Sequence, residues 1–189
     1  MKTKLFVLLF LLSMNSLFAL PNHLTIGTQF SLRHNYQTDQ YIDGLNLQLS
    51  YPVTNRFDIV FSATFDEWRS GRERPAPAYD FEYSYRTTIL LGGFRYSLTN
   101  RDSRISPYVN LLYGTCTDNV QDNWTYYNIA EEGFPVDKTT NHQWIQSDHN
   151  ICIGLGYTFH LNGSLFYDMS FNYNTNYYTN LLIGLNYMF

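Results

Sequence analysis

The last nine residues, Leu181-Leu182-Ile183-Gly184-Leu185-Asn186-Tyr187-Met188-Phe189, alternate between two kinds of side chain. Every second position is bulky and apolar: Ile183, Leu185, Tyr187 and Phe189. Successive side chains of a β-strand point to opposite faces, so a period of two predicts a strand with one continuous apolar face. We therefore interpret the end of this chain as a β-strand.

The same alternation recurs through the chain and predicts eight strands in all. Short turns and long loops alternate between them, which is typical of an up-and-down barrel. The predicted strands cover residues 24–33, 44–51, 57–66, 90–98, 105–113, 151–159, 165–173 and 181–189. The short turns are 54–56, 99–103 and 162–163, and the long loops are 35–43, 67–80, 118–147 and 174–179.

The composition of the two strand faces indicates which face points outward. One face carries Leu, Ile, Phe and Tyr, and the other carries Gly, Ser, Thr, Asn and Gln with a few isolated charges. A lipocalin-like barrel turns its apolar face inward and needs a charged outer face, so it is the weaker alternative. The patterns favour an all-β, eight-stranded antiparallel up-and-down transmembrane β-barrel with short periplasmic turns and long extracellular loops.

The composition and the N-terminal segment restrict the location of the chain. Of its 189 residues 15% are charged, with a net charge of −4, which argues against a nucleic-acid partner. Lys2 and Lys4 precede the apolar run 5–12, and Ala19 provides a small residue for cleavage. This arrangement predicts a signal peptide over residues 1–19 and a barrel domain over 20–189. Together, these features predict export to the outer membrane of a Gram-negative bacterium.

The C-terminal residues also carry a family resemblance. Ile183, Leu185, Tyr187 and Phe189 resemble the terminal strand of bacterial outer-membrane β-barrel proteins, in which this pattern is the assembly signal. The chain is similar to the small eight-stranded group: opacity-type surface proteins, outer-membrane protein X and its adhesin relatives, and the membrane domain of outer-membrane protein A. The resemblance implies the barrel-assembly machinery and outer-membrane lipids as partners, and we expect a monomer.

Two enzymes share this small architecture, but their patterns do not match this chain. The lipid A deacylase has its His and Ser two residues apart on one strand, whereas His160 and Ser164 lie four apart across a turn. The palmitoyl-transferring barrel has an amphipathic helix before its first strand, and residues 21–23 leave no room for one. We predict no catalytic residue, no metal site and no cofactor.

Isolated charges on the polar face predict an ion-pair network inside the barrel. An unpaired charge in such an interior is unfavourable, so these groups should find partners. The candidates are Arg33, Asp58, Arg95 and Asp168. A network that fills the lumen is the favoured interpretation, and a narrow pore for ions or hydrophobic solutes is the alternative.

The long loops carry the candidate binding residues. Arginines near the outer rim suit the phosphates of lipopolysaccharide, and Arg86 on the lipid side of the same rim agrees with this. Aromatic residues in the largest loop suit adhesion to a host or cell-surface ligand. The candidates are Arg69, Arg72, Arg74, Trp124, Tyr126, Tyr127 and Trp144. A β-extension that buries these rings is the alternative.

The two cysteines, Cys116 and Cys152, are candidates for a disulfide because an exported protein folds in an oxidising compartment. Counting from the turns places them a few positions out of register, which a disulfide tolerates poorly, so bridged and free thiols both stay open.

Taken together, the sequence predicts a non-enzymatic outer-membrane surface protein. Its extracellular loops would contact lipopolysaccharide or a host surface, and its barrel would support the envelope. A small porin-like channel is the first alternative, and a lipid A-modifying enzyme is the second.

Overall fold

The computed structural model describes residues 24–35, 40–69, 73–76, 79–100, 103–128, 136–176 and 178–189. The predicted signal peptide, residues 1–19, lies outside the described residues. The described part consists of nine strands: β1 (Thr25–Asn35), β2 (Gln40–Pro52), β3 (Phe57–Arg69), β4 (Glu73–Ala76), β5 (Tyr79–Ser97), β6 (Ile105–Asn128), β7 (Val136–His160), β8 (Leu165–Asn174) and β9 (Tyr178–Met188).

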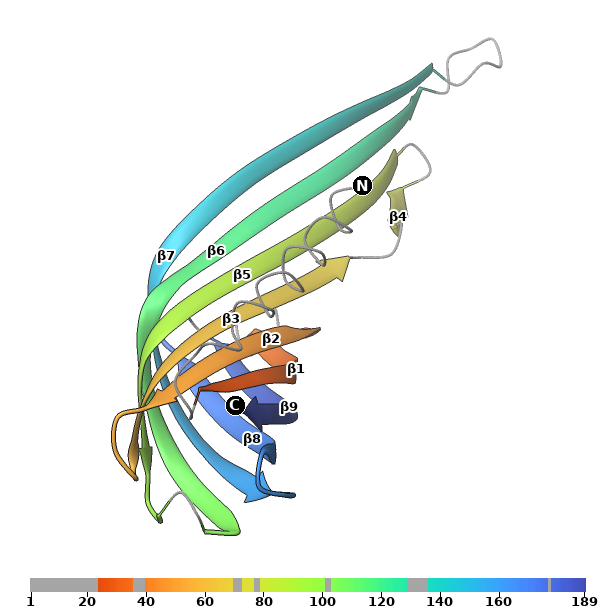
Figure 1. The fold of residues 1–189 in the computed structure, drawn as a ribbon. Coiled ribbons are helices and arrows are strands. Elements are labelled where there is room, and N and C mark those ends of the chain that lie inside the picture. Colours follow the sequence, from red (N-terminus) through yellow and green to blue (C-terminus); the bar gives the residue numbers. More distant parts are fainter. Residues whose placement is uncertain are drawn as a thin grey trace.

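Eight of these strands form a closed antiparallel barrel (Figure 1). β3 pairs with β5, and the short strand β4 pairs only with β5 at the loop end. The first and last strands close the ring, in a register that runs from Thr25 opposite Met188 to Asn35 opposite Tyr178. The predicted fold class is therefore confirmed.

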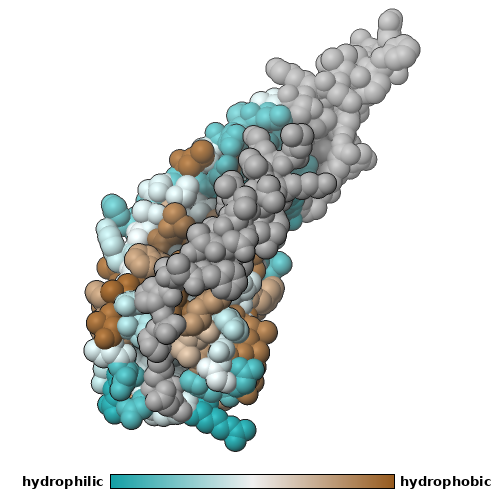
Figure 2. Space-filling view, in the orientation of Figure 1, coloured by the Kyte–Doolittle hydropathy of each residue, from teal (hydrophilic) through white to brown (hydrophobic). Residues whose placement is uncertain are grey.

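The barrel is apolar outside and polar inside. On the outer wall Phe61 is 59% exposed and Leu155 is 64% exposed, whereas Arg33 and Asp168 are fully buried in the lumen. In Figure 2 the hydrophobic residues gather on the barrel wall, between hydrophilic residues at its two ends. This is the reverse of a lipocalin, so the lipocalin-like alternative is wrong.

Exposed tyrosines border the apolar wall at both of its edges. Near the short turns they are Tyr51, Tyr96, Tyr157 and Tyr187, and near the loops they are Tyr41, Tyr113 and Tyr173. Aromatic rings at two levels are typical of barrels that cross a bilayer, because these rings prefer the interface between lipid and water. Between them lies the apolar belt, which ends at Phe65 on β3.

The prediction of a loop over residues 118–147 is wrong. β6 and β7 stay paired without interruption from Ile105 opposite Phe159 to Asn128 opposite Val136. With β5 they form a sheet that projects beyond the barrel, here called the extension (Figure 1). Alternating hydropathy appears only where one face of a strand is buried or in lipid, and most side chains of this segment are polar. The sequence pattern therefore did not reveal these strands.

The candidate disulfide is absent, because the strand register separates the two cysteines. On the β6–β7 pair, Cys116 lies opposite Asp148, and Cys152 lies opposite Leu112. This offset of four residues corresponds to about 14 Å at about 3.4 Å per residue. A disulfide requires Cα atoms about 4.4–6.8 Å apart. Both thiols are free, and each cysteine is 2% exposed.

Alkylation tests this arrangement. We expect both thiols of the folded protein to resist a thiol reagent in detergent, because both are buried, and to react fully after unfolding. Intact mass under non-reducing conditions should show both thiol hydrogens. A mass lower by two hydrogen atoms would mean that the cysteines are bridged and that the β6–β7 register is incorrect.

Candidate functional site

The lumen near the short turns is occupied by a charged network around Arg95 on β5. Its Nη1 lies 3.3 Å from Oδ2 of Asp168 on β8, and its Nε donates to Oδ1 of Asn110 at 3.2 Å. Asn186 on β9 donates to the same oxygen of Asp168 at 2.9 Å. Asp58 on β3 lies directly opposite Arg95 in the strand register. Side chains from five strands thus meet at one buried carboxylate–guanidinium pair.

Tyr108 on β6 completes this network. The guanidinium carbon of Arg95 lies 3.9 Å from the centre of the Tyr108 ring, and the Tyr108 hydroxyl donates to Oδ1 of Asp168. The ring fits because Gly156 faces it: a Cβ at position 156 would lie 2.4 Å from Cζ of Tyr108. A cation over an aromatic face gains about 2 kcal/mol when it is desolvated.

A second network around Arg33 lies nearer the loops. Nε of Arg33 is 3.0 Å from Oδ2 of Asp66, and neither side chain is exposed to solvent. Its Nη2 donates to Oγ1 of Thr87 at 2.8 Å, and Thr87 donates to Asp118 at 2.8 Å. The guanidinium also lies 5.2 Å from the ring centre of Tyr178.

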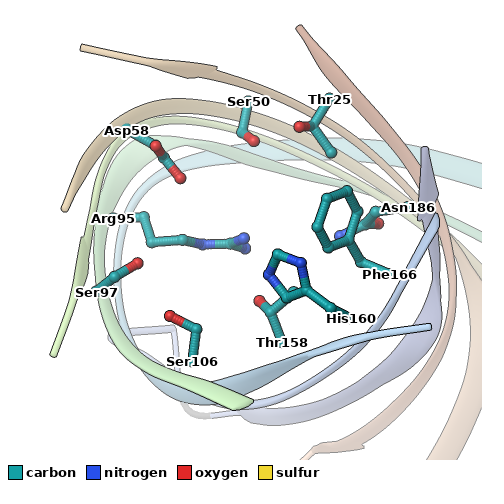
Figure 3. Close-up of a pocket in the computed structure, with 10 residues that line it drawn as sticks. All are labelled: Thr25, Ser50, Asp58, Arg95, Ser97, Ser106, Thr158, His160, Phe166 and Asn186. Atoms are coloured by element: carbon teal, nitrogen blue, oxygen red, sulfur yellow. The ribbon is translucent and has the colours of Figure 1, made fainter. Parts of the chain in front are cut away.

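Between the two networks the lumen is filled by packed side chains. This cluster consists of Val60, Ile89, Leu91, Leu112, Cys116, Cys152 and Tyr178. At the turn end there is a pocket of about 30 Å³, into which Arg95 reaches (Figure 3). A water molecule needs about 10–15 Å³ measured in this way, so the pocket has room for little more than water. The interior of an eight-stranded barrel is just wide enough for side chains to fill it.

The structure brings together three of the four predicted lumen charges. Asp58, Arg95 and Asp168 form one group, as their shared face indicated. Arg33 lies elsewhere, paired with Asp66, which the sequence analysis did not single out. Tyr108 was also missed. Asp66 and Tyr108 each lie on the inward-facing side of their strands. The alternation of inward and outward positions along the sequence was therefore the signal that could have identified them.

Removing the central carboxylate should destabilise the barrel. We expect Asp168→Ala to lower the free energy of unfolding by about 3–5 kcal/mol, because Arg95 would keep its charge in the lumen without its partner. Urea unfolding in lipid vesicles, followed by tryptophan fluorescence, measures this. Glu67→Gln is the control: its exposed ion pairs contribute about 0–1 kcal/mol. Equal effects of the two substitutions would contradict a structural role for the Arg95 network.

Outside the barrel, just above the apolar belt, two arginines share one carboxylate. Arg69 contacts Oε1 of Glu67 through Nε at 2.9 Å and through Nη2 at 2.7 Å, and Nη2 of Arg86 lies 3.2 Å from the same oxygen. These hydrogen bonds lower the pKa of Glu67, so the carboxylate stays ionised. Both arginine side chains are about 60% exposed, and the group carries one net positive charge.

These arginines border a polar hollow on the outer face of the extension, here called the rim site. It has a volume of about 180 Å³ and is lined by Arg69, Glu82, Ser84, Arg86, Asn119, Gln121, Asn123 and Gln143. Lower on β3 and β5 the wall has an apolar hollow of about 510 Å³, whose lining includes Phe61, Ala63, Leu90 and Gly92. The rim site is lined mainly from β5, β6 and β7 and the apolar hollow from β1, β2, β3 and β5, so the two hollows share β3 and β5.

The other predicted binding residues are dispersed. Trp124 is half-buried and donates from Nε1 to Asp122 at 3.2 Å, whereas Trp144 on β7 is 45% exposed. Arg72 lies outside the described residues. Arg74, Tyr126 and Tyr127 lie on β4 and β6, but the description of the structure does not extend to their side chains.

The histidines of the extension have structural contacts. Nδ1 of His149 lies 3.0 Å from the Tyr113 hydroxyl, and Nδ1 of His142 lies 3.0 Å from Oδ1 of Asp122. Among the described residues, no group of three or more His, Cys, Asp or Glu side chains is arranged to hold a metal ion. In the same part of the chain, no helix has the length and hydropathy to cross a membrane.

The residues of the predicted assembly signal lie on the outer wall at the barrel seam. Leu185 and Tyr187 are 50% and 47% exposed, and Ile183 pairs with Phe30 of β1 and Met169 of β8. Phe189 donates its backbone N–H to Leu24 at 2.9 Å. The terminal strand therefore closes the barrel, and its role as an assembly signal stays a prediction.

Comparison with solved structures finds small outer-membrane barrels. The attachment invasion locus protein Ail of Yersinia pestis matches with a TM-score of 0.52 and 16% identity, over 89% of this chain and 97% of that one. Neisserial surface protein A matches with a TM-score of 0.46 and 11% identity, over 88% and 96%. The N-terminal barrel domain of Pseudomonas aeruginosa OprF matches with a TM-score of 0.45 and 11% identity, over 89% and 100%.

The match to Ail agrees with the fold that the alternation predicted, a small outer-membrane β-barrel. At this identity, what this chain shares with Ail is the fold. No family model matches the chain, and no curated protein matches it either.

Proposed function

We propose that this chain is an integral outer-membrane surface protein, not an enzyme, which holds lipopolysaccharide at the rim site and displays the extension to the exterior. The apolar belt between two levels of tyrosines supports the location. The barrel would enter the membrane through the barrel-assembly machinery and would support the envelope. Contact of the extension with a host or cell-surface ligand is part of the same proposal.

The observation that carries this proposal is the position of the Arg69–Glu67–Arg86 group directly above the apolar belt. In the outer leaflet, the phosphorylated sugars of lipopolysaccharide lie at this level. Arginine suits phosphate because its planar N–H donors match two oxygens at once. The apolar hollow lower on β3 and β5 offers a place for acyl chains of the same molecule.

Replacing either arginine should weaken lipopolysaccharide binding. A charge-assisted hydrogen bond contributes about 1.5–3 kcal/mol, so Arg69→Ala or Arg86→Ala should reduce affinity by about tenfold or more. Titration of lipopolysaccharide into the refolded protein in detergent measures this. Arg56→Ala is the matched control, because Arg56 is an exposed arginine at the turn end. Equal affinity of all variants would contradict the rim site.

The filled lumen argues against the channel alternative. We expect the purified protein in a planar bilayer to show no sustained ion conductance above the background of the detergent, because the two charged networks and the apolar cluster occupy the lumen. Discrete, reproducible conductance steps that change with substitution of Arg33 or Arg95 would instead favour a narrow pore.

A lipid A-modifying activity has weaker support. His142 and His149 contact Asp122 and Tyr113. The rings of His34 and His160 lie against Tyr41 and Phe166. Mass spectrometry of lipid A from cells with and without the protein tests the enzyme alternative directly. We expect identical spectra.

A further inference from the structure

The strand register arranges the residues that line the rim site at successive levels above the membrane. At the lowest level, Arg86 on β5 lies opposite Asn119 on β6. At the highest level, Glu82 lies opposite Asn123, four residues further from the barrel. Four residues of a strand span about 14 Å at about 3.4 Å each. The site is therefore long enough to contact a ligand at more than one height.

The positive charge of the rim site is confined to its lower part. Arg86 lies at the lowest level, and Arg69 lies opposite Ser84 at the next level. At the highest level, the charged side chain among the lining residues is the exposed carboxylate of Glu82. Like charges repel each other, so a phosphate is favoured beside the arginines and disfavoured at the upper end.

The upper part of the rim site is lined by uncharged amide side chains. Gln121 and Gln143 lie opposite each other on β6 and β7, and both are exposed. Nε2 of Gln143 donates to Oδ1 of Asn119 at 3.0 Å. The carbonyl of Gln143 and the amino group of Asn119 still offer an acceptor and a donor to a ligand. The hollow thus presents donors and acceptors side by side.

This mixture of donors and acceptors suits sugar hydroxyls better than phosphates. A hydroxyl group both donates and accepts, as an amide side chain does. Phosphate oxygens are acceptors, so they would leave the amide carbonyls without a donor. The hollow has a volume of about 180 Å³. A water molecule needs about 10–15 Å³ measured in this way, so the hollow has room for a much larger group.

We propose that Gln121, Asn123 and Gln143, here called the amide patch, bind core sugars of the lipopolysaccharide molecule whose phosphates contact Arg69 and Arg86. This inference rests on the proposed function and adds the part of the ligand that the amides recognise. The acyl chains of lipopolysaccharide lie in the membrane, its phosphates at the membrane surface and its core sugars further out. The apolar wall, the arginines and the amide patch follow in the same order from the barrel outward.

The arginines and the amide patch adjoin within one hollow. Ser84 lies between them, because it pairs with Arg69 on β3 and with Gln121 on β6. A phosphate and a neighbouring sugar of one molecule therefore fit the site together. A glycan without phosphate would leave the arginines unused, so we assign the sugars to lipopolysaccharide.

Two ligands test this inference with the refolded protein in detergent. The first is lipopolysaccharide with a complete core, and the second is lipid A that keeps its phosphates but has lost the core sugars. Titration calorimetry should give a higher affinity for the complete molecule, because lipid A cannot reach the amide patch. Equal affinity of the wild-type protein for the two ligands would overturn the inference.

Substitutions in the amide patch should affect one ligand and not the other. A neutral hydrogen bond changes affinity by about two- to twelvefold, so Gln121→Ala combined with Gln143→Ala should weaken binding of complete lipopolysaccharide by about fivefold or more. Binding of lipid A should be unchanged. Arg69→Ala should instead weaken binding of both ligands, because both carry the phosphates.

Gln146→Ala is the matched control for the amide patch. Gln146 is an exposed glutamine on β7 like Gln143, but it lies three residues further along the strand and therefore on the opposite face of the extension. This variant should bind both ligands as the wild type does. Heat-modifiable gel migration verifies that each variant is folded. An equal loss in Gln146→Ala, or no loss in the double variant, would contradict the amide patch.

Dextran, a glucose polymer without phosphate, tests the source of the sugars. We expect dextran not to compete with complete lipopolysaccharide, and competition at similar sugar concentrations would overturn the assignment to its core. The outcomes also separate this inference from the proposed function. Wild-type protein that binds neither lipopolysaccharide nor lipid A would overturn both. Protein that binds the two ligands alike would overturn this inference alone.

Discussion

The structure depends on the pairing of the first strand with the last. A backbone in lipid has no water to satisfy its N–H and C=O groups, so a sheet can cross a bilayer only when it has no free edge. The β1–β9 pair removes that edge, and it does so over the full length of both strands. The closed barrel also has an even number of strands, an antiparallel order and an apolar outer wall.

Closure with eight strands also determines the interior. The enclosed space is narrow, so the inward side chains meet across it and fill it. A buried charge is then tolerated only with a partner, which explains why Arg33 lies against Asp66 and Arg95 lies against Asp168. A lumen of this kind stabilises a scaffold and leaves little room for solute passage. Binding chemistry therefore has to lie outside the barrel.

Outside the barrel the physical environment changes along the same strands. Below Phe65 the outward side chains of β3 are apolar, and immediately above it Glu67 and Arg69 are charged. Higher still, β5 to β7 leave the barrel as a sheet. The requirement for a closed edge no longer applies there, since water or another chain can satisfy the backbone. A free edge is permitted in the extension for the same reason that it is excluded in the belt.

The sequence by itself determined the barrel, because lipid outside and a polar lumen inside impose a period of two on every strand in the belt. It also identified the polar face that carries Asp58, Arg95 and Asp168, since alternate residues of a strand point to opposite faces. Only the tertiary structure decided which charges meet, that Arg33 pairs with Asp66, and that Cys116 and Cys152 lie four residues apart in register. These depend on strand stagger, which alternation does not encode. The extension was hidden for a related reason: without one apolar face, its strands leave no periodic signal, and only the continuous pairing of β6 with β7 reveals them.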